Sequence, residues 1–197
     1  MFARAPRYGA VKTRLARDIG AAETLRFYRN TLGGVVRRLL RDQRFEIALA
    51  VTPDHAAAGL PHGLAIIAQG GGDLGRRMVR ALRGAGTRPA VVVGSDIPAL
   101  SASHIRAAFA ALGGAPYVLG PAADGGYWLI GAKHPSRLRH DALDGVRWSS
   151  RNTMRDTMER LQGVAVLSDV LDDIDDGGAY QRISLSASTK RVTSASS

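Results

Sequence analysis

The sequence predicts a single-domain α/β protein with a mostly parallel sheet, and two observations carry that prediction. First, short apolar runs alternate with helical segments along most of the 197 residues, as in the strand–helix–strand units that build parallel sheets. Second, residues 90–93 form an apolar run rich in valine that ends abruptly in Gly94-Ser95-Asp96 and then Pro98. This pattern is typical of a strand buried on both faces of a parallel sheet. Asp96 should then lie at the carboxyl end of a strand, the edge at which open α/β sheets bind ligands.

The other elements follow from periodicity and from breaker residues. Residues 1–4 look like the end of a strand whose beginning is missing. A helix is predicted over 21–41, because apolar residues recur there at three- and four-residue steps. Ser101 and Ser149 or Ser150 are candidate helix caps. Further strands are predicted at 45–51, 64–68, 117–119, 127–130 and 164–167, and further helices at 76–83, 101–112 and 149–161.

Composition limits the class of protein. We expect one domain over 1–183 and a disordered Ser/Ala/Thr-rich tail over 184–197. The absence of cysteine and of a long apolar run favours a cytoplasmic protein with no membrane partner. The net charge of +10 comes from 24 arginines and three lysines that are scattered along the chain. Because no basic run is interleaved with aromatic residues, nucleic acid is not the favoured ligand. The sequence does not indicate an oligomeric state.

A basic loop follows the first strand. It carries Arg7, Gly9, Lys12 and Arg14, and Arg4 stands directly before it. Glycine lets a backbone approach a phosphate, lysine supplies a point charge and arginine a bidentate fork. We therefore predict that this loop binds phosphate, although a surface loop with incidental charge is the alternative.

Carboxylates follow several of the predicted strands. Besides Asp96, there is a turn formed by Asp124, Gly125 and Gly126, and an acidic stretch in which Asp173 and Asp175 alternate. Each has an ordinary explanation as a turn cap, a hairpin turn or a solvated loop. Together with the basic loop, however, they suit a nucleotide held through Mg²⁺ or Mn²⁺, with cations for the phosphate oxygens and carboxylates for the metal.

Two other classes of site are disfavoured. A P-loop requires glycine directly before the lysine, whereas Ala10 and Val11 separate Gly9 from Lys12. The five histidines lack metal-ligand spacing, and no Gly-x-Ser-x-Gly elbow occurs.

Five motifs in order carry a resemblance to a known family. They are Ala5-Pro6-x-x-Gly9-x-Val11-Lys12-Thr13-Arg14-Leu15, Gln69-Gly-x-Gly72-Asp73-Leu74-Gly75-x-Arg77-Met78, Gly94-Ser95-Asp96-x-Pro98, Gly120-Pro121-Ala-x-Asp124-Gly125-Gly126-Tyr127 and Trp148-Ser149. Over residues 2–180 the chain resembles the GT-A, nucleotide-diphospho-sugar transferase-like superfamily. It is most similar to the bacterial branch labelled glycosyltransferase and linked by name to arsenosugar biosynthesis. It also looks like phospholactate guanylyltransferases and molybdenum-cofactor nucleotidyltransferases.

The resemblance implies a three-layer Rossmann-like fold with one antiparallel strand, and it implies roles for the motifs. Lys12 and Arg14 would hold the nucleotide phosphates. Asp96 would be the first metal ligand and Asp175, with Asp173 nearby, the second. The base or sugar pocket would be lined by Gln69, Asp73 and Arg77, and the acceptor side would be formed by Asp124, Gly125, Gly126, Tyr127 and Trp148.

Two departures from the family's pattern bear on the site. The first strand of the family normally has several more apolar residues before the equivalent of Phe2, so the start of this chain is expected to be truncated. The family also ends its acidic stretch with Asp-x-Asp-Thr-Pro, where this chain has Asp173-Ile174-Asp175-Asp176-Gly177.

The sequence thus predicts a metal-dependent transferase that uses an activated nucleotide, with a small-molecule acceptor. In the glycosyl version the donor is a nucleotide sugar and Asp124 is a candidate base for the acceptor hydroxyl. In the nucleotidyl version an acceptor phosphate attacks a nucleoside triphosphate, and pyrophosphate leaves. A non-catalytic nucleotide-binding protein and a basic nucleic-acid-binding module are the remaining alternatives.

Overall fold

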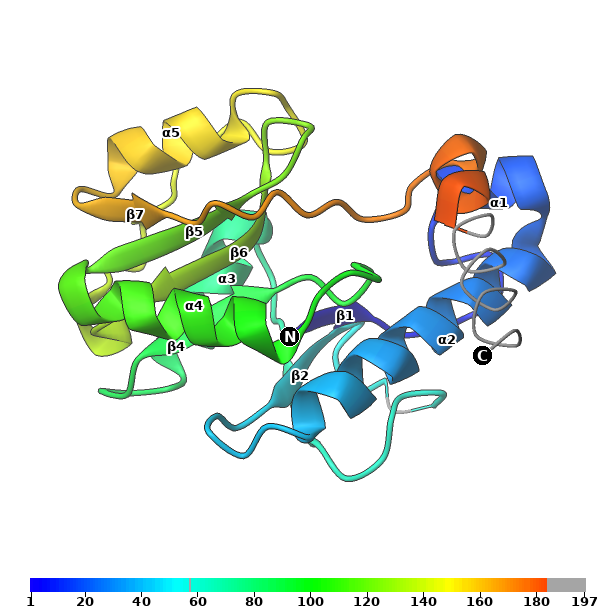
Figure 1. Ribbon diagram of the computed structural model, residues 1–197, viewed down its shortest axis with the longest axis horizontal. Helices are drawn as coiled ribbons and strands as arrows, with labels where there is room; N and C mark the ends of the chain where they lie inside the picture. Colours follow the sequence, from blue (N-terminus) through cyan, green and yellow to red (C-terminus); the bar gives the residue numbers. More distant parts are fainter. Residues whose placement is uncertain (57, 184–197) are drawn as a thin grey trace, which may run out of the picture.

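The computed structural model describes residues 1–56 and 58–183, and within them the strands form two sheets (Figure 1). The first sheet is parallel, with the order β1-β2-β3. The second has the order β4-β6-β5-β7. The strands are β1 (Phe2–Arg4), β2 (Ala48–Thr52), β3 (Ala65–Ala68), β4 (Ala90–Val93), β5 (Tyr117–Pro121), β6 (Tyr127–Ala132) and β7 (Val164–Val166).

A parallel bridge between Phe2 and Gly94 joins the two sheets into one layer with the order β3-β2-β1-β4-β6-β5-β7. Only β6 runs against its neighbours, because it pairs antiparallel with both β4 and β5 while β7 pairs parallel with β5. The prediction of a mostly parallel sheet with one antiparallel strand is therefore confirmed. The connection is thin at the centre, since β1 is only three residues long.

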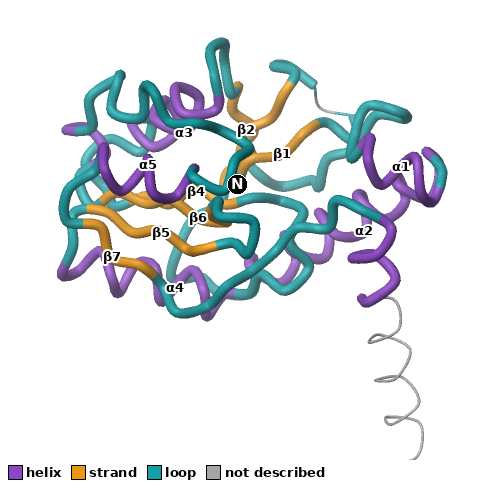
Figure 2. The backbone as a smooth tube through the Cα atoms, turned by 90° about the horizontal axis from the view of Figure 1, so that it is seen from above, coloured by secondary structure: helices purple, strands orange, loops and turns teal. Residues whose placement is uncertain are grey.

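Helices cover both faces of this sheet. In Figure 2, α2 and α4 lie on one side of the strands and α3 on the other. Residues 177–183 are also helical. The bounds are α1 (Thr13–Ile19), α2 (Ala21–Leu40), α3 (Leu74–Arg83), α4 (Ala102–Gly114) and α5 (Thr153–Arg160), with a 3₁₀ turn η1 (Pro135–Arg137).

The core confirms the three-layer arrangement. Side chains that alternate along a strand enter different clusters: Val93 packs with α2 and α4, whereas Val92 packs with α3. The same division separates Val118 from Leu119 on β5. Because successive side chains of a strand point to opposite faces, the central strands are buried on both sides.

Several boundaries differ from the sequence-based expectations. The helix α1 was expected only as part of a loop, and α5 begins at Thr153 rather than directly after Ser149 or Ser150. The predicted cap at Ser101 is confirmed, since Ser101 and His104 form a reciprocal capping box. The expected tail over 184–197 lies outside the described residues. None of the helices within the described residues is long and apolar enough to cross a membrane.

Candidate functional site

A cavity of about 410 Å³ opens at the carboxyl ends of β1 and β4. The sequence-predicted residues that line it are Arg4, Lys12, Arg14, Gln69, Asp96, Asp173 and Asp175. Its other lining residues are Phe2, Ala3, Val11, Thr13, Tyr28, Thr52, Leu74 and Ser95. The cavity thus gathers the basic loop, the end of β4 and the acidic stretch, which are far apart in the sequence.

The ammonium of Lys12 lies among three carboxylates in this cavity. Lys12 Nζ is 2.6 Å from Asp96 Oδ2, 2.7 Å from Asp173 Oδ2 and 2.6 Å from Asp175 Oδ1. The side chain of Lys12 is only 6% exposed, whereas the three carboxylates are 25%, 44% and 52% exposed. The carboxylates therefore hold a cation between them and still face solvent.

Local backbone geometry places Lys12 there. It precedes α1 in a left-handed conformation, with φ 46° and ψ 55°, which turns the chain sharply into the helix. Buried Val11 and Leu15 anchor the loop on either side. Arg4 supports the same loop, because its Nη1 donates to the carbonyl of Ala10 at 3.1 Å.

The acidic residues arrive on an extended segment, residues 168–176, which we call the strap. Figure 1 shows it running from β7 across the molecule to the helices α1 and α2. The strap is held near its start by Trp128, whose Nε1 donates to the carbonyl of Asp169 at 3.0 Å. Beyond the strap, the Gly177 N–H donates to Asp18 Oδ2 at 2.7 Å. Asp173 and Asp175 are therefore fixed from both ends.

The pKa values of Lys12, Asp173 and Asp175 are shifted by burial and by their mutual contacts. Burial opposes the charged form of Lys12, but Asp96 and Asp173 outweigh burial and raise the pKa of Lys12 above its usual value. Burial raises the pKa of Asp173, and Lys12 offsets this only in part. Burial acts in the same sense on Asp175, but its hydrogen bond from Lys12 prevails and lowers the pKa of Asp175. Lys12 therefore remains a cation over the neutral pH range.

Sequence reasoning missed Tyr28 and Ser95, which form the floor of the cavity. The Tyr28 hydroxyl donates to the carbonyl of Arg4 at 2.9 Å and accepts from the Arg4 N–H at 3.0 Å. It also lies 3.3 Å from Ser95 Oγ. Burial raises the pKa of Tyr28. Tyr28 lies within the helix predicted over 21–41, and its polar role has no signal in the sequence.

The residues predicted to line a base or sugar pocket form hydrogen bonds mainly with backbone atoms. Gln69 Nε2 donates to the carbonyls of Ala3 at 3.2 Å and Ala50 at 2.9 Å. Its Oε1 accepts from Arg77 Nη1 at 3.3 Å. Asp73 caps α3 by accepting from the Arg76 N–H at 2.8 Å. Gln69 lines the cavity, whereas Asp73 and Arg77 do not.

The residues expected on the acceptor side form a second group, outside the cavity lining. Asp124 Oδ1 accepts from the Gly126 N–H at 2.8 Å, and Gly125, at φ +84°, packs against the backbone of Arg151. Tyr127 and Trp148 meet edge to face, with ring centroids 6.5 Å apart. Asp172 of the strap links this group to the cavity, because its Oδ1 accepts from the Ala123 N–H at 2.8 Å. In the basic loop, Arg7 and Gly9 are exposed and do not line the cavity.

The three carboxylates fit a divalent cation by their chemistry. Carboxylate oxygens are the ligands that Mg²⁺ and Mn²⁺ prefer, and Asp96, Asp173 and Asp175 already converge on one positive charge. Among the described residues, no three potential ligands form a ready-made metal site. In this structure the ammonium of Lys12 lies between the oxygens of Asp96, Asp173 and Asp175.

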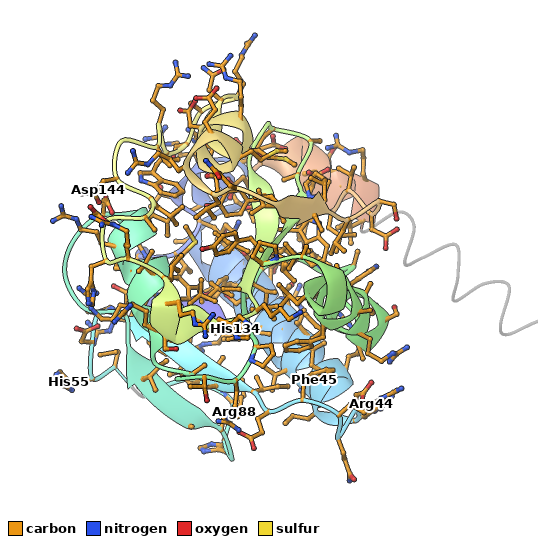
Figure 3. All side chains as sticks on the ribbon, turned by 90° about the vertical axis from the view of Figure 1, so that its left-hand side faces the viewer. Arg44, Phe45, His55, Arg88, His134 and Asp144 are labelled. Carbon is orange, nitrogen blue, oxygen red and sulfur yellow. The ribbon has the colours of Figure 1, made fainter. Side chains whose placement is uncertain are left out.

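Several basic residues outside the cavity are exposed and paired with acids. Figure 3 shows Arg44, Arg88 and Asp144 at the periphery of the face that it presents. Arg44 pairs with Asp42, Arg88 with Glu46 and Arg76 with Asp144. A second hollow of about 520 Å³ lies at the end of α2 and the start of α4, and none of the sequence-predicted site residues lines it.

The structure has a Rossmann-like fold of the kind found in nucleotide-diphospho-sugar transferases. The chain belongs to the family DUF2064, described as an uncharacterized protein conserved in bacteria, whose profile matches residues 35–150. That match includes Asp96 and the β5–β6 turn, but neither Lys12 nor the strap. A search of curated proteins gives no match.

Among the solved structures that resemble the chain are the following two. One is a protein from Desulfovibrio desulfuricans G20 whose name assigns it, provisionally, as a nucleotide-diphospho-sugar transferase. It is 30% identical, with a TM-score of 0.79 over 89% of this chain and 80% of that one. The other is a homologue, from Mycobacterium sp. strain JC1, of a Mycobacterium tuberculosis protein. It is 20% identical, with a TM-score of 0.59 over 97% of this chain and 96% of that one, and it supports the fold alone.

Proposed function

We propose that this protein is a metal-dependent transferase whose donor is a nucleotide-diphospho-sugar. The observation that carries the proposal is the cavity at the carboxyl ends of β1 and β4, where Lys12, Arg4 and Arg14 face Asp96, Asp173 and Asp175. Cations for phosphate oxygens and carboxylates for a metal are what a metal–nucleotide complex needs. The name of the Desulfovibrio desulfuricans protein agrees with this donor class.

The roles follow from charge and position. Arg4, Arg14 and Lys12 bind and orient the phosphates of the donor, with the arginine forks suited to bidentate contacts. Asp96, Asp173 and Asp175 would hold Mg²⁺ or Mn²⁺, which when bound neutralises charge on the nucleoside-diphosphate leaving group. Tyr28 and Ser95 keep the ends of β1 and β4 together beneath these groups.

The acceptor is assigned to the group around the β5–β6 turn. Asp124 is exposed, and its turn is tied to the strap through Asp172. We assign Asp124 as the base that takes the proton of the acceptor hydroxyl, with Gly125, Gly126, Tyr127 and Trp148 shaping that side. Arg7 and Gly9 would approach the donor only if the basic loop moved. Asp73 and Arg77 are assigned to support of the loop after β3 and not to phosphate binding.

Isothermal titration calorimetry of the full chain tests the proposal. Nucleotide sugars are expected to bind with Mn²⁺ and weakly or not at all without it. Mn²⁺-dependent binding of a nucleoside triphosphate together with pyrophosphate release would instead identify a nucleotidyltransferase. Metal-independent binding without turnover would identify a nucleotide-binding protein. Steeply salt-dependent binding of duplex DNA, with no binding of nucleotides, would overturn the transferase assignment.

A further inference from the structure

We propose that the ammonium of Lys12 and a divalent metal ion are alternative occupants of one cation position, so that Lys12 closes the metal site until a metal displaces it. This inference rests on the proposed function. It adds that Lys12 has two states, one on the carboxylates and one released toward the donor phosphates.

The first argument is the number and convergence of the contacts. Three carboxylates from two distant segments meet at one nitrogen, at 2.6, 2.7 and 2.6 Å. These are the short distances of charge-assisted hydrogen bonds. Lys12 Nζ donates hydrogen bonds to Asp173 and Asp175 and forms an ion pair with Asp96, so the ammonium is held by the carboxylates and not by a phosphate.

The second argument is charge balance. One ammonium among three carboxylates leaves the cluster with a net charge of two negative units, whereas a divalent ion in place of the ammonium leaves only one. The carboxylates are also 25–52% exposed, so an ion can reach them from the cavity, whereas the Lys12 side chain, at 6% exposed, lies beneath them. The cluster therefore favours replacement of the ammonium by a divalent cation from solvent.

The third argument is that both cations cannot be accommodated together. A metal bound by the same oxygens would place a double positive charge within a few ångströms of the ammonium, and like charges at that separation repel strongly in a partly buried site. Lys12 must then leave, and Arg4 and Arg14 mark the phosphate-binding side of the same cavity. The expected consequence is that metal binding and the release of Lys12 are one event.

Removal of the lysine tests this directly. Mn²⁺ affinity, measured by calorimetry in the absence of nucleotide, is expected to be roughly 10- to 100-fold higher in Lys12→Met than in the unaltered chain, the equivalent of one charge-assisted hydrogen bond that no longer has to be broken. Arg17→Met is the matched control. Arg17 is exposed on α1, the helix that follows Lys12, and no contact joins it to the three carboxylates among the described residues. Its loss removes one positive charge, so Mn²⁺ affinity should stay unchanged.

A second measurement uses the unaltered chain and does not depend on the folding of any variant. The chain has only three lysines, Lys12, Lys133 and Lys190, so ¹⁵N-lysine labelling gives few side-chain ammonium signals. The Lys12 Nζ signal, assigned by its absence from Lys12→Met or by elimination, is expected to shift or disappear when Mg²⁺ is added, while the Lys133 signal stays in place.

The outcomes separate this inference from the proposed function. Equal Mn²⁺ affinity in Lys12→Met and the unaltered chain, or a Lys12 signal unmoved at saturating Mg²⁺, would overturn the exchange but leave the metal site standing. A rise in affinity in Arg17→Met as large as that in Lys12→Met would also overturn it, because distant charge would then explain the effect. Failure of both proteins to bind Mn²⁺ would overturn the exchange and the metal dependence together.

Discussion

At the scale of single residues, the role of Asp96 can be tested, because a metal ligand and a turn cap respond differently to its substitution. Its carboxylate lies directly after β4 and contacts Lys12 at 2.6 Å. Asp96→Asn removes one negative charge from the three carboxylates that we assign to the metal. We expect the factor by which Mn²⁺ strengthens nucleotide binding to fall by at least about tenfold. Even the loss of a residue that only hydrogen-bonds to a metal ligand costs about that much in metal affinity.

Calorimetry with and without Mn²⁺ measures that dependence. Glu46→Gln is the control, because Glu46 is 83% exposed and pairs only with Arg88 in a surface contact. Metal-dependent affinity that survives in Asp96→Asn would remove Asp96 from the site.

Gly75 shows how a glycine inside a helix can serve packing rather than flexibility. A Cβ at Gly75 would lie 2.6 Å from Trp148 Cζ2 and 3.0 Å from Leu143 Cβ. Alanine normally stabilises a helix interior by about 1 kcal/mol relative to glycine. Gly75→Ala should nevertheless lower the free energy of unfolding by about 1–3 kcal/mol, the usual cost of overpacking, and displace Trp148.

Urea unfolding of Gly75→Ala and Gly34→Ala provides the comparison. Gly34 lies within α2, and a Cβ there would meet only Arg38 Nη1, at 3.8 Å. Gly34→Ala should therefore stabilise the protein. If Gly75→Ala also raises the unfolding midpoint, helix propensity rather than the Trp148 contact governs Gly75.

Sequence reasoning located charged residues of the cavity where they follow strand ends, while the roles assigned to them stay predictions. The sequence brought Lys12, Arg14, Asp96, Asp173 and Asp175 to one sheet edge, and all of them line the cavity. It did not indicate that Lys12 pairs with the carboxylates, because that contact joins residues 161 and 163 positions apart. Nor could it show that Asp73 caps α3, since a cap and a ligand use the same oxygens.

At the scale of elements, the strap depends on how its far end is attached. The Gly177 N–H donates to Asp18 Oδ2, and the Tyr180 hydroxyl donates to Glu23 Oε1 at 2.7 Å. Tyr180 also packs edge to face on Phe27, with centroids 5.2 Å apart. Asp18→Ala removes an acceptor at the start of the helical residues 177–183, a loss that costs a helix about 0.5–2 kcal/mol.

We expect faster hydrogen exchange over residues 172–177 in Asp18→Ala, and weaker Mn²⁺ binding because Asp173 and Asp175 are less well positioned. Exchange mass spectrometry reads the first effect and calorimetry the second. Glu159→Ala, an exposed change on α5, is the control. Unaltered exchange at these residues would show that the attachment at Asp18 does not hold the strap.

The elements that sequence reasoning missed are short or set by tertiary contacts. The helix α1 has seven residues and only Leu15 fully buried, so it has little apolar periodicity. The start of α5 is delayed because the Ser150 hydroxyl accepts from the Asn152 N–H and donates to the carbonyl of Arg147, which makes a turn rather than a cap. By contrast, α2 was predicted closely, because six buried side chains repeat along its twenty residues.

At the scale of the whole molecule, the two half-sheets meet at a narrow seam. β1 and β4 share a single bridge, Phe2 to Gly94. Tyr28 spans the same seam from α2, since its hydroxyl contacts Arg4 on one side and Ser95 on the other. The cavity opens across this seam. We therefore expect the Tyr28 hydroxyl to set the position of Arg4, at the end of β1, relative to Asp96, after β4.

Tyr28→Phe is therefore expected to affect both stability and binding. It keeps the ring in the core but leaves the Arg4 N–H without its partner, at a cost of about 1–3 kcal/mol in the free energy of unfolding. It should also weaken nucleotide binding, since Arg4 and Ser95, the residue before Asp96, lose their common hydrogen-bond partner. Urea unfolding and calorimetry on Tyr28→Phe measure these effects, with Tyr8→Phe, at a position 71% exposed, as the matched loss of a hydroxyl. A variant that loses stability but binds nucleotide with unchanged affinity would show that the seam, although weak, does not set the geometry of the cavity.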